Sequence, residues 1–209
     1  MVTGYLAPSS GEILFKGKSI VGKNPRQVMR AGICRSFQVA QLFPELTVLD
    51  NVLIAYGIMK HKILPLMSPL ATKANIQQAE QLLEEYGITS YMAETVVTLP
   101  QGVRKLLDIA LAMLRKPEIL LLDEPTSGVA IDDKFDLMDT VMRAVRKSGA
   151  AVLFVEHDME VIARYSTRLI AFYDGRVLAD GAVSDVMNDE KVKELVTGHH
   201  LDIDYEQEV

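Results

Sequence analysis

The clearest pattern in the chain is a set of short, unbroken apolar runs that end in polar residues. Residues 119–122 are four aliphatic side chains in a row, and Asp123 and Glu124 follow them directly. Residues 150–155 form a similar run, and residues 33–37, Ile-Cys-Arg-Ser-Phe, also read as a strand. A short continuous apolar run bounded by polar turn residues predicts a strand that is buried on both faces, as in a parallel sheet covered by helices.

Between these runs, apolar residues recur at helical spacing. The segment 47–98 is predicted to be mostly helical, with Gly87 ending one of its helices, and helical faces also follow residues 99–103 and Asp133. Strands that alternate with helices predict an α/β fold with a mostly parallel sheet. Two smaller features are a predicted hairpin around Asp174 and Gly175, and a short helix with Asn24 as its N-cap and Gly32 as its C-cap. We expect the hairpin strands to extend the sheet.

Composition narrows the class of protein. A chain of 209 residues is one α/β domain, with or without a small subdomain. The net charge of −6 and the lack of a basic stripe argue against a nucleic-acid partner. The single cysteine, Cys34, is expected to be a small buried side chain in a reducing compartment. There is no 18-residue apolar run and no signal-peptide pattern at the start, which favours a protein that is cytosolic or bound peripherally to a membrane protein.

The candidate chemistry lies where the 119–122 run ends. Asp123 and Glu124 are predicted at the carboxyl end of a parallel strand, which is where ligands bind in open α/β sheets. Two adjacent acids there suit phosphoryl transfer, since one can hold Mg²⁺ and the other can take a proton from an attacking water. The alternative is a buried strand that simply ends in a polar turn.

The order of the motifs carries a family resemblance. Leu-Pro-Gln-Gly-Val at 99–103 opens a helix, the 119–124 strand follows, and His157 comes directly after the next strand. This order resembles the ATP-binding subunit of an ABC transporter, in which a helix-opening signature motif precedes the Walker B strand. Gly-Tyr-Leu-Ala-Pro at 4–8, Ser-Phe-Gln at 36–38 and Thr-Ser-Gly at 126–128 are most similar to the cassettes of branched-chain amino-acid importers. The resemblance implies a P-loop NTPase-like cassette with a helical subdomain.

The resemblance also implies ATP and Mg²⁺ as cofactors and assigns roles to individual residues. The signature motif at residues 99–103 would contact the nucleotide of the opposing subunit. In this motif, Pro100 and Gln101 replace the usual Ser and Gly. In the loop after the Walker B strand, Ala130 stands where the family usually has Asp. The implied roles are Asp123 for Mg²⁺, Glu124 as general base, Gln38 for Mg²⁺ and the attacking water, His157 for the γ-phosphate, and Gln101 with Gly102 for the partner's nucleotide.

One defining motif of the family, the phosphate loop G-x-x-x-x-G-K-[ST], does not occur in the sequence. Residues 11–19 have five residues between the glycines instead of four. Residues 17–24 have the correct spacing but end in Asn24 instead of a hydroxyl residue, and the alternative for them is a turn between a hairpin and a surface helix. We therefore expect an N-terminally truncated cassette in which the first strands of the nucleotide core lack partners and leave an unpaired sheet edge or exposed apolar surface. We also expect poor or no ATP hydrolysis by this chain alone.

The resemblance divides the chain into four parts. Residues 1–38 are the remnant of the nucleotide core with an antiparallel β part, 39–98 the helical subdomain, 99–186 the signature helix and Walker B core, and 187–209 a C-terminal helix with an acidic tail.

The implied partners are transmembrane permease subunits, a second cassette in a homodimer or heterodimer and, indirectly, a solute-binding protein. The implied location is the cytoplasmic face of the cell membrane, bound peripherally. The alternatives are a non-hydrolysing remnant or regulatory interaction module, and a DNA-repair or chromosome ATPase, which the acidic charge and the lack of long heptad repeats disfavour.

Overall fold

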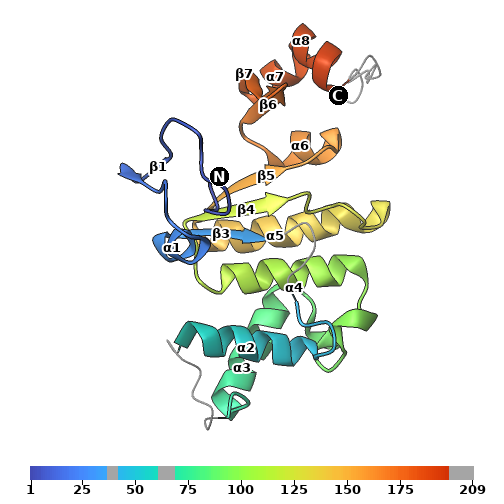
Figure 1. The fold of residues 1–209 in the computed structure, drawn as a ribbon. Helices are drawn as coiled ribbons and strands as arrows, with labels where there is room; N and C mark the ends of the chain where they lie inside the picture. Colours follow the sequence, from blue (N-terminus) through green and yellow to red (C-terminus); the bar gives the residue numbers. More distant parts are fainter. Residues whose placement is uncertain (37–41, 61–68, 198–209) are drawn as a thin grey trace. The chain divides into compact units, whose positions relative to one another are not determined.

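The computed structural model describes residues 1–36, 42–60 and 69–197, drawn in colour in Figure 1. The chain falls into two compact units, residues 1–155 and 156–209. The first unit holds a three-stranded sheet and most of the helices, and the second holds a hairpin with short helices. Among the described residues, no helix is both long enough and apolar enough to cross a membrane.

The sheet of the first unit consists of β3 (Ile33–Ser36), β4 (Ile119–Asp123) and β5 (Ala151–Val155) in the order β3-β4-β5. Both neighbouring pairs are parallel, and Leu122 lies opposite Ser36 on one side and Phe154 on the other. The three segments therefore form the strands that the sequence predicts. Phe37 and Gln38 at the end of the first segment lie outside the described residues.

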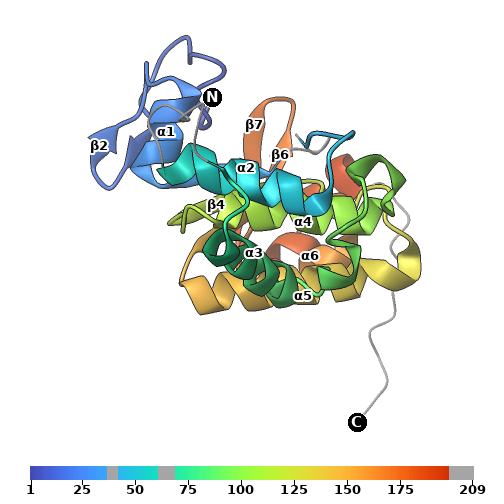
Figure 2. The same ribbon diagram turned by 90° about the horizontal axis from the view of Figure 1, so that it is seen from below.

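Two helices, α4 (Gln101–Met113) and α5 (Lys134–Ser148), lie on the same side of this sheet in both views of the ribbon (Figures 1 and 2). The β4 side chains that alternate onto this side, Leu120 and Leu122, are almost completely buried. Leu107 of α4 and Val141 of α5 are fully buried as well. Burial of these apolar side chains is the main stabilising contribution to this half of the unit.

The opposite face of the sheet is covered only in part. The hairpin of β1 (Leu14–Phe15) and β2 (Lys18–Ser19) and the helix α1 (Pro25–Ala31) pack against its β3 side. Their core is a small cluster of Ile20, Val28 and Ile33, which Ile13, Phe15, Ile119 and Leu121 surround. As predicted, α1 begins at Asn24, whose side chain accepts a hydrogen bond from the Gln27 N–H, and ends at Gly32 with φ 111°. Cys34 is buried as expected, and burial raises the pKa of its thiol although Arg115 lowers it.

On the same face, β5 carries an exposed apolar row. Leu153 and Val155 are 53 % and 54 % exposed, and only β4 pairs with β5 in the described part of the chain. Strands of parallel sheets are ordinarily buried on both faces. Apolar surface is therefore exposed on β5, the last strand of this sheet, whereas the sequence-based expectation placed it at the first strands of the core.

Helices α2 (Val48–Lys60) and α3 (Lys73–Glu85) pack against each other and against α4, and two single 3-10 turns, η1 (Thr89–Tyr91) and η2 (Val96–Thr98), lead back towards α4 (Figure 2). Thr47 and Asp50 cap the start of α2 by exchanging hydrogen bonds, with Asp50 N donating to Thr47 Oγ1 over 3.0 Å. The predicted helical character of the segment 47–98 is confirmed for its described residues. Pro65, within this segment, lies in residues 61–68, which are outside the described residues.

The second unit begins with α6 (Met159–Tyr165) and continues with the hairpin of β6 (Leu169–Tyr173) and β7 (Arg176–Gly181). Asp174 and Gly175 at its tip both have positive φ, 46° and 72°, as the predicted two-residue turn requires. The helices α7 (Val183–Asn188) and α8 (Glu190–Val192) and a π-helical turn, Lys193–Thr197, complete the unit.

One prediction about the hairpin is wrong. Among the described residues, β6 and β7 form a two-stranded sheet of their own and do not extend the parallel sheet. Their pairing is antiparallel with a bulge between Ala171 and Phe172, and Ala171 is buried in a small cluster with Val186 and Val192. The hairpin satisfies its own inner hydrogen bonds and packs on its own helices, so its apolar pattern does not require a place in the larger sheet.

Candidate functional site

The two acids that follow the 119–122 run lie at the carboxyl end of β4, as predicted. Asp123 is the last residue of the strand, and its side chain is 31 % exposed. Arg35 of β3 contacts it directly: Arg35 Nη2 donates to Asp123 Oδ2 over 2.5 Å. Sequence reasoning missed this ion pair, because the two residues are 88 positions apart in the chain.

The backbone of Glu124 is held in an uncommon conformation. Its φ is +46°, in the left-handed region that non-glycine residues rarely occupy. The Glu124 N–H donates to the Val155 carbonyl of β5 over 2.9 Å, and the Glu124 carbonyl accepts a hydrogen bond from Lys105 Nζ of α4. These two contacts fix the peptide groups on both sides of the residue and therefore the direction in which its carboxylate leaves the strand end.

Lys105 is only 5 % exposed, which is unusual for a lysine. It lies four and eight residues before Ile109 and Met113, so it occupies the same buried stripe of α4. A charged residue in register with an apolar stripe is the signal in the sequence that could have identified it. A buried ammonium group requires hydrogen-bond acceptors, and the Glu124 carbonyl supplies one of them.

A second polar contact ties α4 to the neighbouring strand end. Ser36, the last residue of β3, donates from Oγ to Asp108 Oδ2 over 2.6 Å, and both residues are buried. Asp108 lies one turn after Lys105 on α4. The helix thus contacts the carboxyl ends of both β3 and β4, the edge at which parallel strands present ligand-binding groups.

The start of α4 holds the two predicted nucleotide-contacting residues, Gln101 and Gly102. Pro100 precedes the helix without a side-chain cap, and the first N–H groups of a helix have no acceptor within the helix. The Gln101 side chain lies beside Gly128, where an added methyl group would be 3.5 Å from Gln101 Cγ. At Gly102, a methyl group would meet Val129 and Leu137 only at ordinary contact distances. Packing within the chain therefore does not by itself require glycine at position 102.

The structure does not test the roles of the two remaining predicted residues. Gln38 falls in 37–41, outside the described residues. His157 belongs to the second unit, where it is exposed and its backbone N–H donates to Glu156 Oε2 over 3.2 Å. The following residue, Asp158, caps α6 by accepting from the N–H groups of Glu160 and Val161. The roles of Gln38 and His157 stay predictions.

The near match to a phosphate loop at residues 17–24 is a hairpin and a turn. Lys18 and Ser19 form β2, Lys23 N–H donates to the Ile20 carbonyl, and Asn24 uses its side chain to cap α1. These backbone groups are already bonded within the segment and form no open cradle. The alternative interpretation of residues 17–24, a turn before a surface helix, is confirmed.

The donor groups around Asp123 suit Mg²⁺ only in the manner of a nucleotide-bound ion. In the described residues, no group of three or more His, Cys, Asp or Glu side chains gathers to hold a metal. Mg²⁺ in phosphoryl-transfer sites is held by one or two carboxylates, with phosphate oxygens and waters completing its shell. A single carboxylate at a strand end fits that role, and Arg35 now contacts one of its oxygens.

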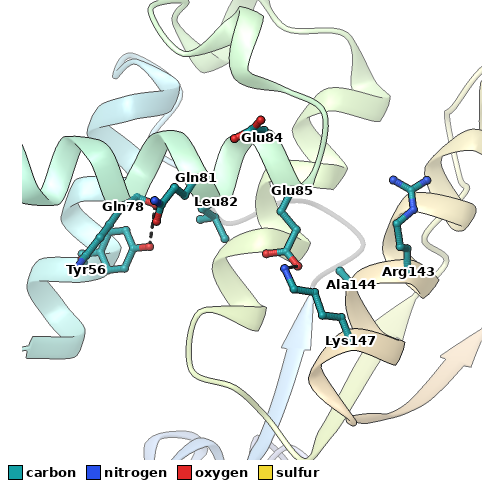
Figure 3. A pocket seen from close by; sticks show the side chains of 9 residues that line it. All are labelled: Tyr56, Gln78, Gln81, Leu82, Glu84, Glu85, Arg143, Ala144 and Lys147. Atoms are coloured by element: carbon teal, nitrogen blue, oxygen red, sulfur yellow. Dashed lines mark hydrogen bonds and ion pairs between the residues drawn. The ribbon is translucent and has the colours of Figure 1, made fainter.

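A groove of about 690 Å³ lies elsewhere in the first unit, between α2, α3 and α5 (Figure 3). Lys147 reaches across it to Glu85, with 3.0 Å between Nζ and Oε1, and the Tyr56 hydroxyl donates to the Gln78 carbonyl. The groove contains Lys147 near the carboxyl end of α5, which leads into the amino end of β5. It is therefore not part of the strand-end site, and its mixed charges favour no particular ligand.

Comparison with known proteins defines the class. The ABC transporter family model matches residues 1–127. The probable branched-chain amino acid transport ATP-binding protein LivG of Archaeoglobus fulgidus is 30 % identical over 200 residues, covering 94 % of this chain and 77 % of the relative. The high-affinity branched-chain amino acid transport ATP-binding protein BraF of Pseudomonas aeruginosa is 29 % identical, covering 91 % and 77 %.

Solved structures agree with this match. The crystal structure of the ADP conformation of MJ1267, an ATP-binding cassette of an ABC transporter, superposes with a TM-score of 0.78 at 27 % identity, covering 94 % of this chain and 80 % of that one. A nucleotide-free ATP-binding cassette from an ABC transporter also gives 0.78, at 28 % identity, covering 92 % and 79 %. The fold is thus that of an ATP-binding cassette, a P-loop NTPase-like α/β protein. The chain belongs to the ABC transporter family, among its ATP-binding subunits.

Proposed function

We propose that this chain is the ATP-binding subunit of an importer for branched-chain amino acids. The single observation that carries the proposal is the pair Asp123 and Glu124 at the end of β4, held by α4 through Lys105. The names of its relatives in Archaeoglobus fulgidus and Pseudomonas aeruginosa supply the substrate class.

The proposed site assigns each residue one task. Asp123, with Gln38, holds the Mg²⁺ that accompanies ATP and neutralises charge on its phosphates. Glu124 takes the proton of the attacking water, and its fixed backbone supports this role because a general base must be correctly oriented. His157 donates a hydrogen bond to the γ-phosphate. Gln101 and Gly102, at the start of α4, bind the nucleotide of the partner cassette through the positive end of the helix.

The partners follow from the same proposal. Residues 39–98 form the subdomain that meets the permease, within the four-part division 1–38, 39–98, 99–186 and 187–209. Two cassettes, as a homodimer or heterodimer, enclose the nucleotides between them, and a solute-binding protein delivers the amino acid to the permease. The cassette works at the cytoplasmic face of the membrane.

We further propose that these 209 residues alone hydrolyse ATP poorly or not at all. The sequence contains no G-x-x-x-x-G-K-[ST], whose backbone cradle and lysine make most of the phosphate contacts in such enzymes. This observation equally favours the second candidate, a non-hydrolysing regulatory module that uses the cassette fold for binding.

Equilibrium binding of Mg-ATP to the chain, with Asp123→Ala as the control, tests the nucleotide part. We expect a Kd above about 1 mM, equivalent to about −4 kcal/mol. Micromolar binding that weakens in Asp123→Ala would contradict the proposed weak binding of ATP and make the chain a competent ATPase of unusual construction.

The substrate class is tested by reconstituting the chain with its permease and measuring uptake of leucine, isoleucine and valine, with lysine as the control. Lysine uptake without leucine uptake would refute it.

A further inference from the structure

We propose that Arg35 occupies the Asp123 carboxylate until a divalent cation arrives, and that the cation binds by displacing the Arg35 guanidinium. The inference rests on the proposed function of Asp123 as the Mg²⁺ residue. In this inference, Arg35 competes with the metal for Asp123 and thereby lowers the affinity of Asp123 for the metal.

The sheet register brings the two charges together. Arg35 lies opposite Leu121 in the parallel pair of β3 and β4, and Asp123 follows Leu121 by two residues. Side chains of a strand alternate between the two faces, so Arg35, Leu121 and Asp123 project to the same face. This is the face opposite α4, and the Arg35 and Asp123 side chains are 32 % and 31 % exposed there. A cation in solution can therefore reach the pair.

The contact itself is the kind that competes with a metal. Arg35 Nη2 lies 2.5 Å from Asp123 Oδ2, so the two side chains form a direct charge-assisted hydrogen bond. A divalent cation on either oxygen of the Asp123 carboxylate would lie close to the Arg35 guanidinium, and two positive charges that close together repel each other strongly. In the proposal, binding of the cation is therefore coupled to opening of the ion pair.

The strength of the pair determines the size of the effect. Ion pairs with this degree of exposure contribute up to about 1 kcal/mol, and a site that is open only part of the time binds with an affinity reduced by that fraction. Removal of the guanidinium should therefore increase the affinity of Asp123 for a divalent cation about fivefold. The displaced side chain has a way out, since it is already partly in solvent.

The test uses Mn²⁺ without nucleotide as the probe and the full chain as the sample. Paramagnetic broadening of the backbone amide signals of Leu122, Asp123 and Glu124 reports binding at this carboxylate and not at the other surface acids. In Arg35→Gln, half-broadening should require about one fifth of the Mn²⁺ that the unmodified chain requires. Lys16→Gln is the matched control, because it removes one positive charge from another ion pair of the same unit, that with Glu118.

The outcomes separate the inference from the proposed function. An unchanged titration in Arg35→Gln, or an equal shift in Lys16→Gln, overturns the displacement. If one of these two results is found and Asp123→Asn still abolishes the broadening, the displacement is wrong but the Mg²⁺ role of Asp123 stands. No broadening of these amides in any variant overturns the displacement alone, because in the proposed function phosphate oxygens of the nucleotide complete the Mg²⁺ shell, and the Mg-ATP measurement tests that function separately. The unmodified chain provides a second measurement if Arg35→Gln does not fold: added Mg²⁺ should shift the Arg35 side-chain Nε–H signal as the guanidinium leaves, and a signal that does not move overturns the displacement.

Discussion

Lys105 shows how one buried side chain can set the geometry of another residue. It is 5 % exposed and donates to the Glu124 carbonyl, and Glu124 has a backbone conformation that costs about 1–2 kcal/mol for a residue with a side chain. The contact therefore helps to hold Glu124 in a conformation that it would otherwise leave. Lys105 does not touch the reaction itself and acts by positioning Glu124.

Substitution of Lys105 by methionine should lower the free energy of unfolding by about 1–3 kcal/mol, because it keeps the length of the side chain but leaves the buried Glu124 carbonyl without this donor. Urea denaturation followed by circular dichroism measures the change. Lys147→Met is the matched control. Its ammonium group is exposed and paired with Glu85, so the loss should stay below about 1 kcal/mol. Equal losses in the two variants would show that Lys105 has no special structural role.

At the scale of elements, α4 is connected to both strand ends by polar contacts on top of its apolar packing. The Ser36–Asp108 hydrogen bond joins it to β3, and the Lys105–Glu124 contact joins it to the end of β4. Movement of α4 relative to the sheet would break these hydrogen bonds, so α4 and the two strand ends should behave as one rigid body.

A double-mutant cycle tests this coupling. Ser36→Ala and Asp108→Asn should each lower the free energy of unfolding by about 1–3 kcal/mol. Together they should cost at least about 0.5 kcal/mol less than the sum, because the second change removes a partner that is already lost. Ser148→Ala serves as the control, since its hydroxyl bonds only to nearby backbone groups, the Val145 carbonyl and the Ala150 N–H, and the change should cost no more than about 0.5 kcal/mol. Strict additivity of the first pair would mean that the contact does not couple α4 to β3.

The sequence predicted the elements better than the contacts between them. The strands β3, β4 and β5 follow from local strand patterns in the sequence, and α1 follows from Asn24 and Gly32 at its ends. The Arg35–Asp123 pair could not be predicted, because it depends on the register of two strands that are far apart in the chain. The separate β6–β7 sheet was missed for a similar reason: the strand pattern does not state which edge a strand will join.

At the scale of the whole molecule, the exposed apolar row on β5 is the feature least typical of the core of an α/β protein. Leu153 and Val155 are more than half exposed on a strand that the described residues pair on one edge only. Apolar surface of this kind on a sheet edge favours association with other apolar surfaces.

Substitution of Leu153 by lysine should reduce the binding of an apolar fluorescent dye and the self-association of the chain, with a change in stability within about 0.5 kcal/mol. Dye fluorescence and sedimentation velocity measure the two effects. Ile131→Lys is the control, since Ile131 is 78 % exposed but lies in a 3-10 turn away from the row. An unmodified chain that binds no dye and stays monomeric would contradict the prediction.

The left-handed backbone at Glu124 has a consequence for selection. Glycine adopts this conformation without steric cost, so a glycine there would make the chain more stable than the glutamate does. A library of variants that is screened only for folding should therefore become enriched in glycine at position 124, whereas a library screened for transport should keep the acid. The position where these two libraries diverge most would identify, from sequencing alone, a residue retained for its chemistry against the preference of the fold.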